Sequence, residues 1–447
     1  MASLAERHQA LLQWVEAAGG RLHPAVEIYH DEVTNGSFRV REEAGGLGPD
    51  EAIVSLPLSC SLSFLNAIAG HPSIAATVPP AISAPEDEEA YFPTEFLSNA
   101  PPHVVGRFFL MQEYLRREDS KWWPYIRTLP PPAQMAGMLP VVWPAGDVEF
   151  LRGTNAYVAV HEIRSALRRE FKQAMRLLPE RFAYEYTRPL YYWAYCIFTT
   201  RSFRPSLILP DAASLSLPCG TDDFSVLLPL FDMGNHAPLA KIAWVTDEDS
   251  RTCTLRAGQP YAAGQQVYNN YGAKTNAELL LGYGFVLPEG DDFHNDYMHI
   301  KTKANPAAGD LDASHVVSLR PISHPSSVAG RSRLLDPAHL SCLPCFSHFQ
   351  DSLLAALFES IAGRREGVPD VSLTEIMRGE MPPELLQEII DALGTKLSMD
   401  LEEIEDHDPS YEAENPNQEL ALLYRCQCKK VLDQALASLS TASSLEA

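Results

Sequence analysis

The chain has 447 residues, of which 46% are hydrophobic, and its 35 basic and 58 acidic side chains give a formal net charge of -23. This length and hydrophobic content suffice for two or three domains with cores of their own. The acidic excess disfavours nucleic acid as a ligand, because it repels phosphates, and it either keeps the protein soluble or attracts a basic protein over a Debye length of about 8 Å.

The N-terminal segment, residues 1–21, is predicted to form an amphipathic helix. Leu4, Leu11, Leu12 and Val15 are separated by charged and polar residues, which is typical of a surface helix and not of a signal peptide. No apolar run approaches the roughly 20 residues of a membrane helix. The eight cysteines follow no disulfide spacing, which favours a reducing compartment. We therefore expect a cytoplasmic or nuclear protein that does not insert into a membrane.

Residues 22–66 are predicted to be rich in short strands. Alternating hydrophobic and polar residues, around the turn residues Asn35 and Gly36, mark strands at 26–29, 37–40 and 52–56. This segment is expected to be the first part of a β-rich domain.

Residues 67–185 are predicted to be a mostly helical insert. It begins with an expected exposed loop that contains Pro79, Pro80 and the acidic run 86–89. Helical hydrophobic patterns follow at 104–118 and 147–178.

Residues 186–288 are predicted to complete the β-rich domain, which the insert therefore splits in two. The helical pattern at 184–200 leads into short strands at 242–245, 253–255 and 266–268.

Residues 289–447 are predicted to form a separate, all-α C-terminal domain. A looser span around Asn305 and Pro306 precedes helical patterns at 346–362, 383–394 and 415–439.

The most informative stretch is an apolar run at 227–231 that delivers the polar sequence Asp-Met-Gly-Asn-His, residues 232–236, into an expected interior. Buried polar groups cost a few kcal/mol unless they are paired, so these side chains are either satisfied locally or face a ligand. Asn235 and His236 could simply tie a tight turn together.

A second polar stretch follows at 266–272, Gln-Val-Tyr-Asn-Asn-Tyr-Gly. Beyond it, Thr275 and Glu278 have the spacing of a capping box, which predicts a helix that Gly282 or Gly284 ends. Asn276 could therefore be only a helix-start residue.

These motifs together resemble those of SET-domain protein lysine methyltransferases, in the branch related to Rubisco large-subunit and ribosomal-protein lysine methyltransferases. Residues 232–236 are similar to the Asn-His motif of the family, and Tyr271 lies where the family has its catalytic tyrosine. The sequence Tyr-Gly-Phe at 283–285 is similar to the closing motif.

Two segments further upstream extend the resemblance. Residues 195–203 are similar to a helix that ends in Ser-Arg-x-Phe, with Thr200 in place of the serine. Residues 120–126, followed by Leu129 and Pro130, are similar to a motif of the family's insert. The resemblance implies an α+β fold, in which a SET domain of short β-sheets is split by an α-helical insert and followed by an all-α C-terminal domain that resembles the family's substrate-binding domain.

The chain departs from the family at the start of the SET domain. The family usually has a Gly-x-Gly turn that lets the backbone close over the cofactor, whereas this chain has Gly36, Ser37 and Phe38. Backbone amides could still hold a carboxylate there. The departure leaves open a second hypothesis, a SET-fold adaptor that binds proteins without catalysis.

The resemblance implies S-adenosyl-L-methionine as cofactor, with Tyr271 as the catalytic residue and with no metal. The residues implied in cofactor binding are Gly36, Ser37, Phe38, Arg201, Asp232, Asn235, His236, Tyr271 and Phe285. Those implied around the substrate lysine are Thr200, Arg201, Asp232, Trp244, Tyr271 and Tyr283. On residue type alone, Trp244 fits core packing better than a channel wall, and Arg201 could be structural.

The chemistry suits these residue types. A lysine amine has a pKa of about 10.4, and it must lose its proton before it attacks the sulfonium methyl group. Desolvation in an aromatic channel and repulsion by the sulfonium cation both lower that pKa. The Tyr271 hydroxyl would orient the amine and the methyl group.

We therefore expect a monomeric protein lysine N-methyltransferase that acts on a non-histone, basic protein such as a ribosomal protein. A histidine acceptor stays open, as does the adaptor hypothesis.

Three other classes of site fit the sequence less well. The Gly-Asn-His sequence also occurs in binuclear metallophosphatases, but the one Asp-x-His sequence, residues 292–294, lies downstream instead of upstream, and Ala237 stands where an acid is expected. Cys342 and Cys345 have zinc-ligand spacing, yet Cys426 and Cys428 lie two residues apart in an expected helix and would point away from each other. No strand leads into a Gly-x-Gly-x-x-Gly dinucleotide motif.

Overall fold

The computed structural model describes residues 3–31, 35–71, 74, 78, 91–209, 219–247, 249, 251–302, 313–365, 371–409 and 412–441. The chain divides into two compact units. The first unit comprises residues 1–135 and 164–272, and the second comprises residues 136–163 and 273–447. The expected acidic loop at 86–89 and the Asn305-Pro306 turn lie outside the described residues.

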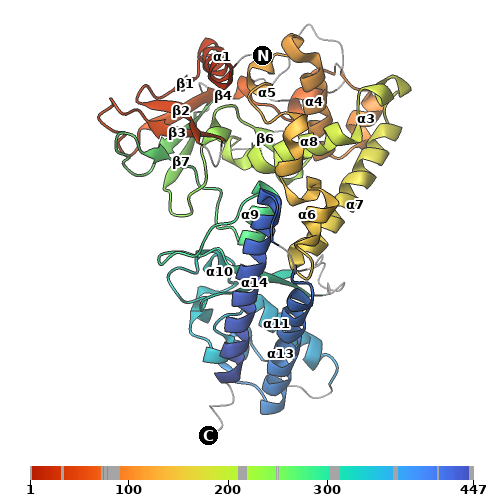
Figure 1. Ribbon diagram of the computed structural model, residues 1–447, viewed down its shortest axis with the longest axis vertical. Coiled ribbons are helices and arrows are strands. Elements are labelled where there is room, and N and C mark those ends of the chain that lie inside the picture. Colours follow the sequence, from red (N-terminus) through yellow and green to blue (C-terminus); the bar gives the residue numbers. More distant parts are fainter. Residues whose placement is uncertain are drawn as a thin grey trace. The chain divides into compact units, whose positions relative to one another are not determined.

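Helices dominate both units (Figure 1). The α-helices described are α1 Leu4–Ala17, α2 Phe64–Ala69, α3 Thr94–Asn99, α4 Pro102–Arg116, α5 Trp123–Ile126, α6 Ala145–Glu149, α7 Asn155–Arg176, α8 Arg188–Arg201, α9 Asn276–Tyr283, α10 Val328–Arg331, α11 Asp351–Ala362, α12 Leu373–Arg378, α13 Pro383–Asp406 and α14 Pro416–Ser440.

The strands are short, as the sequence predicted. They are β1 Arg21–Leu22, β2 Val26–Asp31, β3 Asn35–Val40, β4 Ala52–Pro57, β5 Ser202–Phe203, β6 Val226–Leu227, β7 Ile242–Asp247, β8 Thr252–Ala257, β9 Gln266–Val267, β10 Tyr297–Lys301 and β11 Ser314–Ser318.

Three antiparallel sheets form the β part of the first unit. One has the strand order β1-β4-β8-β7, the second β2-β3-β9, and the third pairs β5 with β6. Strands from before and after the insert thus share the same sheets, since β4 pairs with β8 and β3 with β9. This pairing confirms the predicted β-rich domain that a helical insert splits.

The helices of the first unit pack through aromatic side chains. Phe108 of α4 stacks on Phe171 of α7 and contacts Tyr191 of α8. Arg107 of α4 donates hydrogen bonds to Glu170 of α7 and to the Tyr191 hydroxyl. The burial of Phe108 and this polar cluster hold the three helices together.

The predicted single helix at 147–178 is wrong in one respect, because the structure breaks it between α6 and α7. Gly153 lies in the break with φ +83, a conformation that L side chains rarely adopt. A Cβ there would come within 2.5 Å of the Glu403 carbonyl oxygen. The close approach of α13 therefore requires a glycine at this point.

The second unit is not all-α as predicted, because β10 and β11 form an antiparallel pair within it. The predicted helix at 383–394 extends further, to Asp406, and the one at 346–362 begins later, at Asp351. Around these elements lies a continuous apolar core that includes Leu354, Leu397 and Val431. None of the helices in the described part of the chain is long and apolar enough to cross a membrane.

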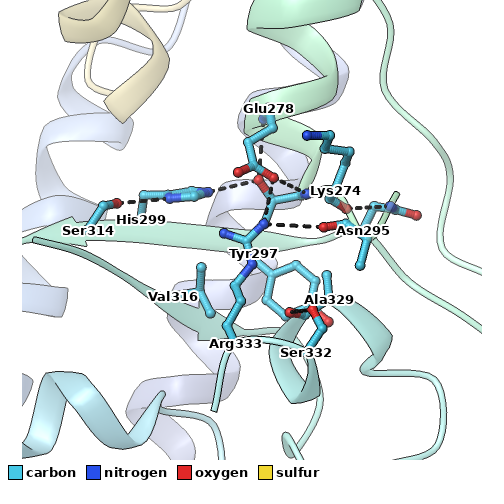
Figure 2. A network of polar contacts seen from close by, with 12 residues as sticks. Lys274, Glu278, Asn295, Tyr297, His299, Ser314, Val316, Ala329, Ser332 and Arg333 are labelled. Atoms are coloured by element: carbon cyan, nitrogen blue, oxygen red, sulfur yellow. Dashed lines mark hydrogen bonds and ion pairs between the residues drawn. The ribbon is translucent and has the colours of Figure 1, made fainter. Parts of the chain in front are cut away.

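A polar network in the second unit fixes the start of α9 (Figure 2). Arg333 donates to the Glu278 carboxylate at 2.7 Å, and Glu278 in turn accepts from the backbone N–H of Thr275. The Thr275 hydroxyl lies 2.8 Å from Nε2 of His299, and the Asn295 side chain donates to the Lys274 carbonyl oxygen. The predicted capping box is therefore confirmed, and Arg333 and His299 contact its two residues.

Asn276 is more than a helix-start residue. Its side chain, 1% exposed, donates to the Leu287 carbonyl oxygen and lies within hydrogen-bond distance of Asp296 and Gln427. It also accepts from the Leu287 N–H. Gly284, with φ +79, ends the helix, as one of the two predicted alternatives.

His294 gives the second unit a pH-dependent stability. Burial lowers the pKa of His294 to about 4, and its Nε2 lies 2.9 Å from the Ser327 hydroxyl. Because the unfolded chain binds a proton near pH 6.5, the contribution of His294 to the free energy of unfolding falls as the pH falls from about 6.5 to about 4. We predict that the wild-type protein loses roughly 2 kcal/mol more than His294→Gln between pH 7 and pH 5.

Urea denaturation at both pH values measures this difference. The control is His161→Gln, which replaces an exposed histidine of the same unit and should keep the wild-type pH dependence. Equal losses in the wild-type protein and in His294→Gln would contradict the prediction.

Candidate functional site

The polar motif begins at a strained turn. Strand β6 pairs with β5, and Leu227 also exchanges backbone hydrogen bonds with Leu62. Three residues later Leu230, fully buried, has φ 72 and ψ -41. A non-glycine residue in this region costs on the order of 1–3 kcal/mol and is tolerated where the surroundings impose it. The turn directs the chain into the 3-10 helix Phe231–Met233 and then into the motif.

The two polar stretches run parallel to each other. The Asn269 N–H donates to the Asn235 carbonyl oxygen at 2.8 Å, and the Ala237 N–H donates to the Asn269 carbonyl oxygen at 3.0 Å. At Gly234, a Cβ would lie 3.3 Å from Cβ of Asn269 and 3.6 Å from the ring of Phe38. Glycine lets the two segments approach this closely.

The motif holds Tyr271 through two hydrogen bonds, one from its backbone and one from its side chain. Its N–H donates to Nδ1 of His236 at 3.0 Å, and its hydroxyl donates to the Gly234 carbonyl oxygen at 3.0 Å. The two rings stack with centroids 4.9 Å apart. Since Nδ1 of His236 accepts a hydrogen bond, that nitrogen carries no proton.

Asp232, the first residue of the motif, forms a polar cluster with Arg201 and Tyr125. Oδ2 of Asp232 accepts hydrogen bonds from Arg201 at 3.0 Å and from the Tyr125 hydroxyl at 2.8 Å. Burial raises the pKa of Tyr125 well above its usual value, so the hydroxyl stays protonated and donates. Burial alone would lower the pKa of Arg201, but Asp232, Tyr125 and Tyr271 raise it overall.

Burial raises the pKa of Asp232 and encloses its second oxygen. Its side chain is 0% exposed, and Oδ1 has no hydrogen-bond partner among the residues that the structure describes. A buried carboxylate oxygen left in this state costs about 1–3 kcal/mol or more, so a donor that reaches it gains that amount. The cluster is therefore suited to a cationic or hydrogen-bond-donating ligand.

The Gly36-Ser37-Phe38 segment lies on β3, next to the motif. Among the residues that the structure describes, a Cβ on Gly36 would meet only the terminal methyl group of Met233, at 3.8 Å, so backbone at this position is approachable. The Ser37 hydroxyl, fully buried, donates to Oε1 of Gln266. The Phe38 side chain is 1% exposed and lies beside Gly234. The phenyl group at the family's second glycine position is thus part of the core.

The structure does not bring every predicted side chain to this cluster. The Thr200 hydroxyl donates to the Cys196 carbonyl oxygen within α8. Trp244 packs on Phe203 and Phe231, with centroids 5.0 and 5.2 Å away, which favours the core-packing alternative.

Tyr283 and Phe285 belong to the second unit. Their ring centroids lie 6.3 Å apart at the end of α9. Their implied roles at the lysine and the cofactor stay predictions.

Sequence reasoning missed Tyr125 and Gln266 as site residues, although both lie in motifs that it singled out. Tyr125 belongs to the insert motif, and Gln266 opens the stretch that ends in Tyr271. The motif resemblance located these residues, but their partners are about 100 and 230 positions away in the chain. Only the folded arrangement reveals them.

The cysteines with zinc-like spacing form no ligand set in the described part of the chain, where no group of three or more His, Cys, Asp or Glu side chains could hold a metal ion. All eight cysteines are free thiols. On α14, Cys428 is buried and Cys426 is exposed, as neighbours two apart on a helix should be.

Comparison with known proteins bears on the class of this fold and site. No model of a protein family matches the chain. The ribosomal lysine N-methyltransferase set10 of Schizosaccharomyces pombe is 31% identical over 277 residues, which cover 61% of this chain and 44% of the relative. An actin-histidine N-methyltransferase of Gallus gallus is 29% identical over 197 residues, 41% of this chain and 29% of the relative. The chain thus spans less than half the length of these relatives.

Solved structures extend the likeness to the whole chain. The SET domain of LSMT bound to lysine and AdoHcy has a TM-score of 0.66 and 17% sequence identity, and the match covers 100% of this chain and 93% of that one. The protein therefore has the fold of the SET-domain class, as its motifs indicated. Within that class, it is related in sequence to protein N-methyltransferases.

The hydrogen bond from Tyr125 stabilises the buried cluster. Tyr125→Phe removes one of the two side-chain donors to Oδ2 of Asp232 and leaves that buried oxygen with Arg201 alone as its side-chain donor. We predict a loss of roughly 1–3 kcal/mol in the free energy of unfolding, measured by urea denaturation.

The matched control is Tyr114→Phe, in the same unit, because the Tyr114 ring packs against Trp193 and its ring is kept by the change. This control should lose less than about 0.5 kcal/mol. A Tyr125→Phe protein as stable as the control would show that Asp232 does not depend on this donor.

Proposed function

We propose that the protein is an S-adenosyl-L-methionine-dependent protein lysine N-methyltransferase. The observation that carries the proposal is the fixed position of the Tyr271 hydroxyl. Tyr271 is held on the motif by hydrogen bonds to His236 and to the Gly234 carbonyl oxygen. An adaptor would have no use for a hydroxyl held in this way. The SET fold and the sequence relatives named as lysine methyltransferases support the same activity.

The residues present fit the cofactor. Backbone around Gly36 is approachable, and an amino acid carboxylate of a ligand needs such backbone donors. Asp232 contributes a buried carboxylate oxygen that has no hydrogen-bond partner among the residues that the structure describes. When bound, S-adenosyl-L-methionine supplies an electrophilic methyl group on a sulfonium ion. Asn235 and His236, by resemblance, contact the adenine end.

The protein's own residues then have to prepare the amine. A substrate lysine must shed its proton, which burial and a neighbouring positive charge both promote. The guanidinium of Arg201 is paired with the Asp232 carboxylate, so the negative charge of Asp232 is balanced and does not hold the amine protonated. The Tyr271 hydroxyl, which already points to one fixed acceptor, orients the amine lone pair and restricts its motion.

The substrate that fits best is a basic protein. A chain with a net charge of -23 attracts a basic partner and repels nucleic acid. The name of the S. pombe relative supports a ribosomal protein. We further propose that the protein acts as a monomer in the cytoplasm or nucleus.

Transfer of labelled methyl groups from S-adenosyl-L-methionine into the proteins of a cell extract tests the activity. We predict one or a few labelled bands, with the label on lysine after acid hydrolysis. Tyr271→Phe should lower the rate constant roughly 100-fold, because it removes the orienting hydroxyl, and should leave binding of S-adenosylhomocysteine within about two-fold, as one hydrogen bond outside the cofactor predicts.

The matched control is Tyr268→Phe, which changes a tyrosine three positions away and should retain the wild-type rate. Label on histidine would show that the acceptor is a histidine, as the name of the actin-histidine N-methyltransferase relative states for that protein. The absence of both label and S-adenosylhomocysteine binding in the wild-type protein would favour the adaptor hypothesis.

A further inference from the structure

Gln266 joins three elements of the first unit through one carboxamide. Its Oε1 accepts hydrogen bonds from the Ser37 hydroxyl and from the Asn235 side-chain amide, both at 2.9 Å. Its side-chain amide nitrogen, Nε2, donates a hydrogen bond to the Tyr29 hydroxyl at 2.6 Å. Both acceptor positions of Oε1 are therefore used.

The partners of Gln266 come from distant parts of the chain. Tyr29 and Ser37 face each other across β2 and β3, and β9 places Gln266 opposite Arg39 on the next strand. Asn235 lies on the polar motif, whose backbone pairs with Asn269. The contact between Gln266 and Asn235 thus ties the edge of the β2-β3-β9 sheet to the motif.

We propose that Gln266 is a positioning residue for the cofactor, an inference that rests on the proposed function. Ser37 and Asn235 are the side chains implied at two separate parts of the cofactor site, and Gln266 is the group that touches both. It holds the β3 segment and the motif in one register, although it need not touch the cofactor itself. Since the bonds exist before the ligand arrives, the site is preorganised and less ordering is needed on binding.

The buried hydroxyl of Ser37 depends on Gln266 as its hydrogen-bond acceptor. Its hydroxyl is fully buried, and Gln266 is the hydrogen-bond partner that the structure gives it. Removing that acceptor leaves a buried hydroxyl unsatisfied, which disfavours the present position of Ser37 on β3. Any change in that position also changes where the neighbouring Gly36 lies.

Two substitutions separate positioning from general stability. Gln266→Met keeps the length of the side chain but accepts no hydrogen bond from Ser37 or Asn235. Gln266→Glu keeps an acceptor for both, and its second oxygen can accept from the Tyr29 hydroxyl. The matched control is Gln265→Met, because the neighbouring exposed side chain accepts only from the Ala262 N–H within its own turn.

Calorimetric titration with S-adenosylhomocysteine is the first readout. We expect Gln266→Met to weaken binding about 10-fold, as the loss of one buried hydrogen-bond partner predicts. Gln266→Glu and Gln265→Met should stay within about three-fold of wild type. In methyl transfer, Gln266→Met should raise the KM for S-adenosyl-L-methionine by a similar factor and change kcat by less than about two-fold, since the lost interaction acts equally on ground and transition states.

The outcomes distinguish this inference from the function on which it rests. If wild-type protein binds no S-adenosylhomocysteine, the proposed function fails. If wild-type protein binds and Gln266→Met binds equally well, or if Gln266→Glu loses as much as Gln266→Met, the positioning role is wrong. Should Gln266→Met fail to fold, Ser37→Ala provides the second test, because it removes the buried donor from the other side. It should weaken binding of S-adenosylhomocysteine by more than about three-fold, and binding within the range of the controls would overturn the positioning role.

Discussion

The parallel backbone pairing of residues 235–237 with Asn269 is the constraint on which the rest of the site depends. Two N–H donors and two carbonyl acceptors are satisfied there between segments more than 30 positions apart. Because buried backbone groups must find partners, this pairing fixes where each segment lies. It places Tyr271 over His236, Gly234 against Phe38, and Gln266 within reach of Asn235.

Burial then gives the polar side chains their properties. Asp232 is enclosed, and it is tolerated there because Arg201 and Tyr125 come to one of its oxygens. An ion pair of this kind contributes little net stability, since the loss of water offsets much of the attraction. Its value is positional, because the guanidinium of Arg201 and the phenol of Tyr125 are both held at one oxygen of Asp232.

The sequence predicted the helix cap, the short strands and the order of elements well. The capping box at Thr275 and Glu278 is determined by residues three apart, and the alternating strands follow from a period of two, so both could be predicted. The motif resemblance correctly indicated the SET fold. The pair β10 and β11 was missed because its strands flank residues 303–312 and their hydrophobic pattern is short. The break at Gly153 was missed because its cause, the approach of Glu403, is remote in sequence.

The site itself was predictable only in part. Arg201, Asp232, Asn235, His236 and Tyr271 lie together in the first unit, where their motifs indicated. Trp244 and Thr200 have partners of their own that no spacing reveals. The departure at Phe38 raised the question of an adaptor, and the structure shows why the residue is tolerated: its ring fills core volume beside Gly234.

The most direct test of the central claim is a crystal structure of the protein with S-adenosylhomocysteine and a lysine-containing peptide. The account predicts that the lysine amine lies about 3 Å from the Tyr271 hydroxyl, within hydrogen-bond distance, on a line toward the cofactor sulfur. A cofactor or a lysine bound away from Tyr271 and Asp232 would contradict it.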